Sequence, residues 1–174
     1  AEDELRLINR LIDERLVDIQ YQPIIDLNAR SIFGYEAFAR PNDGYFRTPI
    51  ELIAAAERSG SVGRLGRHLR RLALRDCSNS SLFLNLEPSE LAEAPLSQPD
   101  EPSLTATKPV YLEIGRAFPE TLQRECWHTL SGLREKGVRL AIDNIGAGSA
   151  GLRAMLDLEP EIVKLHRKMV VGCA

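Results

Sequence analysis

The sequence predicts an α/β fold in a single domain that spans residues 1–174. Six segments have the apolar or alternating patterns of β-strands, and the last four alternate with helix-like segments, which is typical of parallel β/α architecture. The 174 residues are 44% hydrophobic, enough to bury the core of one domain. Several strands also carry one polar residue at or near an end. Because strand ends on one face supply the active-site groups of a β/α barrel, we expect a barrel-like sheet with a site at one mouth.

The N-terminal elements are expected to be a helix followed by an antiparallel hairpin. Leucine and isoleucine recur at helical spacing within residues 1–18, with charges between them, which predicts an amphipathic helix. The strand at 19–27 contains Pro23, which favours the edge of a sheet. Only a short polar stretch separates it from the next strand at 31–40. Because that stretch cannot hold a crossover helix, the two strands should pair antiparallel.

The rest of the chain is expected to alternate helices and strands. Pro49 stands in the favoured first turn of one helix, and Gly60 follows the end of that helix. Residues 92–109 contain prolines at 95, 99, 102 and 109 and no apolar periodicity, so they are predicted to form an irregular loop. The predicted helices are 49–58, 62–77, 119–136 and 150–158, and the further strands are 82–86, 110–114, 139–145 and 161–166.

The segment Arg139–Leu152 is the most informative part of the chain, because an apolar strand delivers Asp143 directly before a glycine-rich turn. An unpaired buried carboxylate is costly, so such a strand has little reason to carry one unless it meets a metal, a phosphate or a partner charge. Other strands repeat the pattern. The candidate site residues are Glu36, Asn85, Glu113, Asp143 and Lys164. Each one alone is better explained as a partly exposed strand-end residue, whereas the joint pattern favours a shared site.

Composition and charge argue against several functions. A net charge of −3 gives no electrostatic footprint for DNA or RNA. No apolar run approaches the roughly 20 residues of a membrane span, and the charged N-terminus is unlike a signal peptide, so we expect a cytoplasmic protein. The three cysteines and three histidines show no spacing typical of a metal site.

Two further features have a structural and a functional interpretation. Five arginines lie on or near one predicted helix, at Arg64, Arg67, Arg70, Arg71 and Arg75. A solvated helix face is the favoured explanation for them, and an anionic partner is the alternative. Trp127 is expected to pack against the core rather than to fill a groove on a partner.

Six segments, taken in order, resemble those of the EAL domain, the cyclic di-GMP phosphodiesterase domain of bacterial signalling proteins. These segments are YQPIIDL, GYEAFAR, LFLNLEPSEL, VYLEIGR, LAIDNIGAGSAGL and IVKLHR. The resemblance extends from about Leu5 to Val171, and an ordered set of motifs is far more specific than any one of them. It implies a modified TIM barrel with an antiparallel first strand, in agreement with the hairpin predicted above.

The resemblance also implies roles for individual residues. Glu36-Ala37-Phe38 matches the motif that names the family, with phenylalanine in place of leucine. The ligands of a divalent cation, Mg²⁺ or Mn²⁺, are matched by Glu36, Asn85, Glu113 and Asp143, and oxygen ligands suit both ions. Lys164 matches the lysine that contacts the attacking water or the phosphate. The positions that match nucleotide-binding residues are Gln22, Phe38 and Arg40.

Departures from the family pattern surround the same site. Active members carry two adjacent aspartates where this chain has Asp143-Asn144, and an asparagine can neither neutralise a second dication nor act as a base. Arg116 replaces a glutamate that steadies the glycine-rich loop, and Gly115 replaces the threonine before it. His166 replaces an aspartate. Together these changes predict a degenerate, catalytically inactive domain.

The chain ends at its sixth predicted strand, whereas a complete β/α barrel typically needs about 250 residues. We expect either that the chain is a fragment of a longer protein or that a protein partner or a second copy completes the fold. The predicted function is a non-catalytic regulatory domain in cyclic di-GMP signalling that binds the nucleotide or a protein partner. The alternative is an active metal-dependent cyclic di-GMP phosphodiesterase completed by missing residues or by a second chain.

Overall fold

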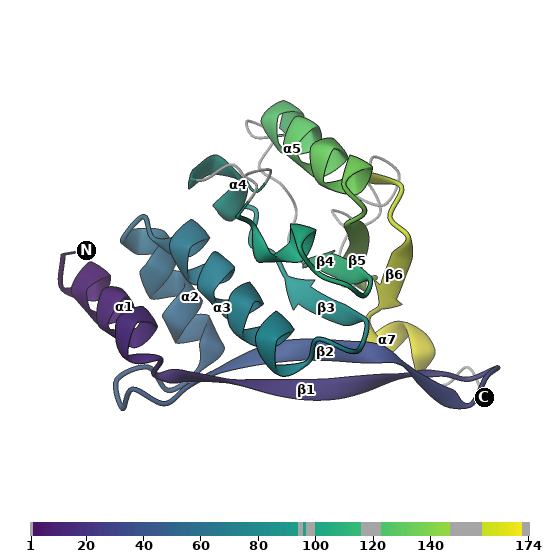
Figure 1. The fold of residues 1–174 in the computed structure, drawn as a ribbon, viewed down its shortest axis with the longest axis horizontal. Coiled ribbons are helices and arrows are strands. Elements are labelled where there is room, and N and C mark those ends of the chain that lie inside the picture. Colours follow the sequence, from purple (N-terminus) through teal and green to yellow (C-terminus); the bar gives the residue numbers. More distant parts are fainter. Residues whose placement is uncertain (1, 94–95, 97–99, 116–122, 147–157, 172–174) are drawn as a thin grey trace.

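The computed structural model describes residues 2–93, 96, 100–115, 123–146 and 158–171 of the chain (Figure 1). The helices are α1 (Glu2–Glu14), α2 (Pro49–Arg58), α3 (Val62–Asp76), α4 (Glu90–Glu93), the 3₁₀ helix η1 (Pro102–Leu104), α5 (Gln123–Glu135) and α7 (Arg167–Val170). The strands are β1 (Val17–Asp26), β2 (Ser31–Pro41), β3 (Leu82–Asn85), β4 (Val110–Ile114), β5 (Arg139–Ile145) and β6 (Ile162–Leu165).

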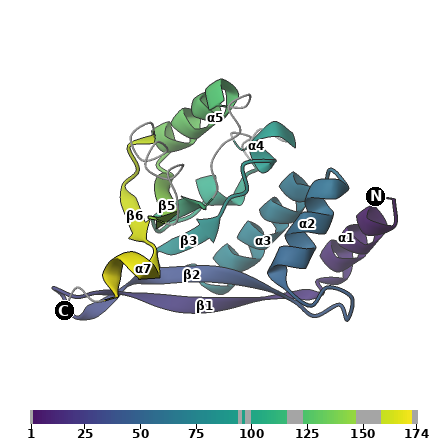
Figure 2. The ribbon, with the colours of Figure 1, turned by 180° about the vertical axis from the view of Figure 1, so that it is seen from behind.

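The six strands form one sheet in the order β1-β2-β3-β4-β5-β6. β1 and β2 are antiparallel, with Val17 opposite Pro41 and Asp26 opposite Ser31. All later neighbours are parallel. The long β1–β2 hairpin lies on the opposite side of the molecule from α5 (Figures 1 and 2), and among the described residues β1 and β6 each have one neighbouring strand. The sheet is therefore an open, mixed half-barrel, which confirms the predicted fold class.

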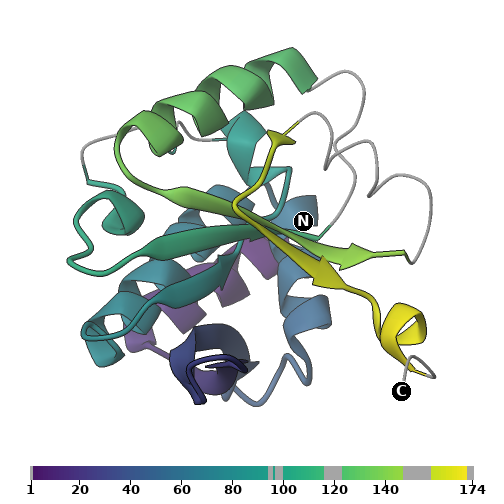
Figure 3. The same ribbon diagram turned by 90° about the vertical axis from the view of Figure 1, so that its right-hand side faces the viewer.

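The sheet buries side chains on both faces. Toward the helices, Leu84, Leu112 and Leu140 join the main core together with Leu130 and Leu133 of α5. The described part of α5 runs along this face of the sheet (Figure 3), and Trp127 packs against the same core, as predicted. Burial on both faces explains why β3, β4 and β5 are almost continuously apolar.

The concave face of the sheet carries a smaller aromatic layer. Phe83, Tyr111 and Ala141 form it, each at most 3% exposed. The rings of Phe83 and Tyr111 are stacked with their centroids 4.4 Å apart, a geometry that adds to the burial of their apolar area. This layer lies on the same face of the sheet as several of the polar residues at the strand ends.

Local sequence features explain the main boundaries. The side chain of Thr48 accepts a hydrogen bond from the backbone N–H of Glu51, and Pro49 fills the first turn of α2. Gly34 allows β2 to approach the segment before β3, since an added Cβ would lie 2.7 Å from the carbonyl oxygen of Ser81. That carbonyl accepts a hydrogen bond from the N–H of Tyr35, which fixes the start of the β2–β3 pairing.

A buried ion triad ties α3 to α4 and η1. Arg70 is 2% exposed, and it donates from Nε to Oε1 of Glu101 and from Nη1 to Oε2 of Glu90, both at 2.7 Å. For Arg70 the predicted solvated helix face is therefore wrong. The reason is non-local, because Glu101 lies 31 residues away in the segment predicted as an irregular loop.

Three further boundaries differ from the predictions. The N-terminal helix, predicted over 1–18, ends at Glu14, and Val17 already begins β1. The loop predicted over 92–109 contains the end of α4 and the helix η1, because Glu101 caps η1 by accepting a hydrogen bond from Ser103 N–H. The helix α7 was not predicted. The expected helix 150–158 and the start of the one expected over 119–136 lie largely outside the described residues.

None of the described helices combines the length and the apolar character that a membrane span needs.

Candidate functional site

The polar strand-end residues lie on the concave face of the half-barrel. Side chains alternate between the faces of a strand, so Asn85 shares a face with Phe83, and Glu113 shares one with Tyr111. In the register of the sheet Asn85 lies opposite Glu113, and Glu36 lies opposite Gln22. Glu36 is in register with Phe83, and Glu113 is in register with Ala141, so these polar side chains share a face of the sheet with the aromatic layer.

Lys164 connects two of the carboxylates across the half-barrel. Its Nζ lies 2.5 Å from Oε2 of Glu36 and 2.7 Å from Oε1 of Glu113. The side chains of Lys164, Glu36 and Glu113 are 23%, 14% and 0% exposed. Charge-assisted hydrogen bonds with so little solvent contact are among the stronger polar interactions in proteins. The structure thus brings β2, β4 and β6 together at one ion cluster.

The electrostatics of this cluster are set by burial. Burial raises the pKa of Glu113 to about 7, although the ammonium of Lys164 acts to lower it. The second oxygen of that carboxylate, Oε2, is buried and accepts no hydrogen bond from the described part of the chain. Burial acts to lower the pKa of Lys164, but the hydrogen bonds that its ammonium donates to Glu113 and Glu36 outweigh burial and raise the pKa. Lys164 therefore remains an ammonium ion.

Asp143 is engaged by its neighbour. Nδ2 of Asn144 donates a hydrogen bond of 2.6 Å to Oδ2 of Asp143. Asn144 has a φ of +60°, in the left-handed region that asparagine tolerates better than most residues. Gly146, with φ +96°, begins the turn that follows β5. The left-handed backbone conformation of Asn144, near the end of β5, accompanies the hydrogen bond from its amide to the carboxylate of Asp143.

The donor types suit a divalent cation, but the arrangement of the carboxylates does not. Carboxylate and amide oxygens are the ligands that Mg²⁺ and Mn²⁺ prefer, and the free Oε2 of Glu113 is one such donor. However, no three histidine, cysteine, aspartate or glutamate side chains within the described ranges come together as a metal site. A dication would first have to displace Lys164 from Glu36 or Glu113. The observed geometry fits an ammonium ion.

The predicted nucleotide-binding residues lie along the hairpin. The guanidinium carbon of Arg40 is 5.7 Å from the centre of the Phe38 ring. Its Nε donates to Oε1 of Gln20 at 2.8 Å, and its Nη1 donates to the carbonyl of Ala39 at 3.0 Å. Within the part of the chain that the structure describes, these bonds use two of the five N–H donors of the guanidinium, so three remain for an anion.

Sequence reasoning missed Gln20, which orients Arg40. The signal was available in the strand alternation, since Gln20 and Gln22 share a face of β1 and Gln20 lies opposite Phe38 in the hairpin. The bond from Asn144 to Asp143 was also missed, because it depends on the positive φ of Asn144.

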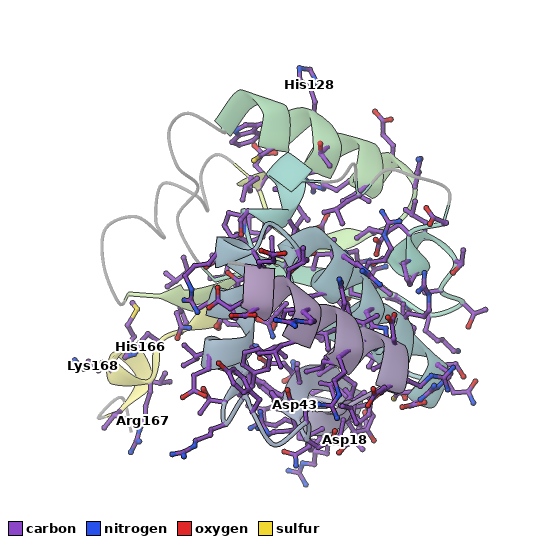
Figure 4. All side chains as sticks on the ribbon, turned by 90° about the vertical axis from the view of Figure 1, so that its left-hand side faces the viewer. Asp18, Asp43, His128, His166, Arg167 and Lys168 are labelled. Atoms are coloured by element: carbon purple, nitrogen blue, oxygen red, sulfur yellow. The ribbon has the colours of Figure 1, made fainter. Side chains whose placement is uncertain are left out.

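The three remaining departures differ in placement. Gly115 follows β4, where an added Cβ would lie 4.0 Å from the Cβ of Asp143. Arg116 lies outside the described residues. His166 caps the N-terminus of α7, where its Nδ1 accepts a hydrogen bond from the N–H of Lys168. His166 projects at the α7 end of the molecule, far from His128 on α5 (Figure 4).

The family model described as the EAL domain matches residues 6–174. Among curated proteins, the chain is 27% identical over 162 residues to the "Probable cyclic di-GMP phosphodiesterase PdeI" of Escherichia coli (strain K12), which covers 83% of this chain and 21% of that protein. It is 30% identical over 169 residues to "Uncharacterized protein y4lL" of Sinorhizobium fredii, which covers 88% of this chain and 20% of that protein. The chain thus spans about a fifth of the length of these curated relatives.

Solved structures show the same fold. The Xanthomonas citri FimX EAL domain, in complex with c-diGMP, matches with a TM-score of 0.78 and 17% identity over 98% of this chain and 72% of that chain. Klebsiella pneumoniae BlrP1, in a calcium and cy-diGMP complex, matches with a TM-score of 0.74 and 23% identity over 90% of this chain and 42% of that chain.

Proposed function

The chain belongs to the EAL domain family, and we propose that it is a regulatory domain in cyclic di-GMP signalling that binds the nucleotide without hydrolysing it. The relatives support the signalling context, since one is named a probable cyclic di-GMP phosphodiesterase and the FimX and BlrP1 structures are complexes with the nucleotide. The chain covers a minor part of most of these proteins, so the proposal concerns this domain alone.

The main support for the absence of hydrolysis is the contact of Lys164 with both Glu36 and Glu113. Metal-assisted hydrolysis of a phosphodiester relies on cations that generate a hydroxide and clamp the attacking and leaving oxygens. Here the ammonium of Lys164 donates hydrogen bonds to the carboxylates of Glu36 and Glu113. The amide of Asn144 donates one to the carboxylate of Asp143. The replacement of a carboxylate by Asn144 also removes one negative charge that would attract a second dication.

Nucleotide binding is supported by the hairpin. Beside the aromatic face of Phe38, Arg40 has N–H donors that no other described residue accepts. A guanidinium can bind two oxygens of one phosphate through parallel hydrogen bonds, and an aromatic ring can stack against a base. Because Gln20 fixes the guanidinium, less side-chain entropy is lost when a phosphate binds.

A metal-dependent phosphodiesterase is the second candidate, and the free Oε2 of Glu113 favours it. A buried carboxylate oxygen without a partner is costly and is satisfied when a cation or an ordered water reaches it. In this alternative, Mg²⁺ or Mn²⁺ would be held by oxygens of Glu36, Asn85 and Glu113 and would supply Lewis-acid chemistry.

The test is calorimetric titration of the purified chain with cyclic di-GMP, with and without Mn²⁺, combined with chromatographic detection of the linear dinucleotide. We expect binding without turnover, and at least a tenfold loss of affinity in Arg40→Gln but not in Arg47→Gln, which removes an exposed cation outside the site. Metal-dependent turnover that disappears in Asp143→Ala would establish the second candidate. If cyclic di-GMP does not bind, the proposed nucleotide-binding function is wrong. That result would favour a domain that contacts a protein partner or a second copy of itself.

A further inference from the structure

A groove lined by charged, hydroxyl and apolar side chains lies at the opposite end of the strands from the candidate site. It has a volume of about 330 Å³, at the lower end of the range for small-molecule sites. Arg71 and Arg75 of α3 form one wall, Ser78 and Ser80 lie before β3, and Lys108 lies before β4. The groove is therefore built at the amino ends of β3 and β4, whereas Asn85 and Glu113 lie toward the carboxyl ends of the same strands.

Most arginines of α3 are neutralised within the chain. Arg64 contacts Asn9 and Asp13, and Arg67 donates to Asp100 at 2.9 Å. Arg70 belongs to the buried triad with Glu90 and Glu101. Arg75 donates from Nε and Nη2 to the two carboxylate oxygens of Asp76 at 2.6 and 3.1 Å. Among the five arginines, Arg71 is therefore the best candidate to bind an anionic partner.

Arg71 and Lys108 have no carboxylate partner among the residues that the structure describes. Both are exposed and line the same groove. Asp100 is the acidic side chain at this groove, and its carboxylate is already bound to Arg67. In a chain with a net charge of −3, two cations left uncompensated in one concavity form a local site of positive potential.

Hydroxyl groups complete the lining. Ser78, Ser80, Thr105 and Thr107 all line the groove, and Thr107 Oγ1 donates a hydrogen bond to the carbonyl of Ser78 at 3.4 Å. Thr105 Oγ1 donates to the carbonyl of Pro102, which leaves its lone pairs rather than its proton facing solvent, while the serine hydroxyls remain available as donors in the described structure. Donor hydroxyls and guanidinium groups recognise phosphate oxygens together.

The positive charges near the groove also act on the buried His68 of the same helix. Burial lowers the pKa of His68, and the charges of Arg71, Arg15, Arg64 and Arg75 act in the same direction. A negatively charged ligand in the groove would be attracted by Arg71 and Lys108 at close range.

We propose that this groove binds a small phosphorylated molecule, with Arg71 and Lys108 contacting its phosphate oxygens and the serine hydroxyls donating further hydrogen bonds. The site is independent of the carboxylate layer, because it uses none of the residues assigned to cyclic di-GMP. Its position between α3 and the segment before β4 means that a ligand would link these two elements.

Inorganic pyrophosphate is the probe that tests the proposal, titrated into the chain in metal-free buffer and followed by calorimetry and by amide chemical shifts. We expect one site whose affinity falls with added salt, and shifts at Ser78, Ser80 and Lys108. The double variant Arg71→Gln/Lys108→Gln should bind at least tenfold more weakly. The control Arg6→Gln/Arg47→Gln removes the same charge from α1 and the loop before α2 and should stay within twofold.

Three outcomes would overturn the proposal: no binding, equal weakening in the control, or shifts centred on Glu36 and Lys164 instead of the groove. Comparison of AMP with adenosine identifies the ligand class. A phosphate site predicts that AMP competes with pyrophosphate and that adenosine does not, whereas equal competition by adenosine would contradict recognition of the phosphate.

Discussion

Gly66 of α3 and Glu90 of α4 approach so closely that a Cβ added to the glycine would lie 2.1 Å from Oε2 of the glutamate. That oxygen accepts the hydrogen bond from Nη1 of Arg70, one helical turn farther along α3. The missing side chain therefore makes room for the carboxylate that neutralises a buried guanidinium. The position requires glycine for space, and its φ lies outside the left-handed region.

Gly66→Ala should destabilise the fold. The methyl group would push the Glu90 carboxylate from Arg70, and overpacking of a buried site typically costs about 1–3 kcal/mol. Urea denaturation followed by circular dichroism measures the change. Gly132→Ala is the matched control, because Gly132 lies within α5 with nothing within 4 Å of an added Cβ. That control should be neutral or more stable by about 0.5–1 kcal/mol, as expected for alanine in a helix, and equal losses in both variants would contradict the steric explanation.

Removal of Arg70 should cost more than removal of any surface arginine. Arg70→Met leaves Glu90 and Glu101 buried without their cation, and breaking a buried pair in this way typically costs about 3–5 kcal/mol. Adding Glu90→Gln and Glu101→Gln to that variant should recover part of the loss, because the uncompensated charges are then gone. Arg10→Met, at an exposed pair with Glu14, serves as the control and should change the free energy of unfolding by less than about 0.5 kcal/mol. A small effect of Arg70→Met would show that the triad contributes little.

The contribution of Glu113 to the free energy of unfolding should fall as the pH rises from about 5 to 7. Its pKa is 4.5 in the reference state and about 7 in the fold, so within this window the folded chain holds a proton that unfolding releases. The free energy of unfolding then decreases with pH, by on the order of 1 kcal/mol per pH unit.

Glu113→Gln should flatten this dependence, since the amide does not titrate. Glu161→Gln is the control for the sign. The backbone N–H of Leu140 and the guanidinium of Arg134 outweigh burial and lower the pKa of Glu161. The stabilising effect of Glu161 is therefore lost only as the pH falls below the unfolded value of 4.5, and the slope between pH 5 and 7 should persist in that variant. Denaturation midpoints measured from pH 5 to 7 test this prediction. If the free energy of unfolding of Glu113→Gln changes with pH as in the parent chain, Glu113 is not the group responsible.

Lys164→Met should weaken the apo fold and at the same time increase its response to Mn²⁺. The variant frees the carboxylates of Glu36 and Glu113, and a ligand that binds only the folded state raises the melting temperature in proportion to its binding free energy. Thermal unfolding with and without Mn²⁺ measures the effect. Lys168→Met on the exposed helix α7 removes the same charge and should respond as the parent chain does. No gain in Mn²⁺ response in Lys164→Met would mean that the lysine does not compete with a cation.

The order of the elements could be predicted because it depends on local patterns. Alternating and apolar runs located all six strands, and the short link before Ser31 indicated the antiparallel pair. The exact limits of the helices could not be predicted in the same way. The end of α1 at Glu14 depends on where β1 begins to pair with β2. The buried position of Arg70 was equally out of reach, because it depends on a carboxylate far away in the chain and not on the charge pattern of α3.

The candidate site was predictable as a set of residues but not as a set of contacts. Strand alternation alone was enough to place Glu36, Asn85 and Glu113 on one face of the sheet. The partner of each carboxylate depends on the curvature of the sheet, which brings Lys164 within reach of β2, and on the backbone conformation of Asn144. Neither the curvature of the sheet nor the backbone conformation of Asn144 can be obtained from the spacing of residues in the sequence.

The contact between Lys164 and Glu36 joins residues 128 positions apart. A loop of that length carries a large closure entropy unless the strands between the two residues have already docked. We therefore expect the ion cluster to form after those strands, and a kinetic probe at this lysine would test that order.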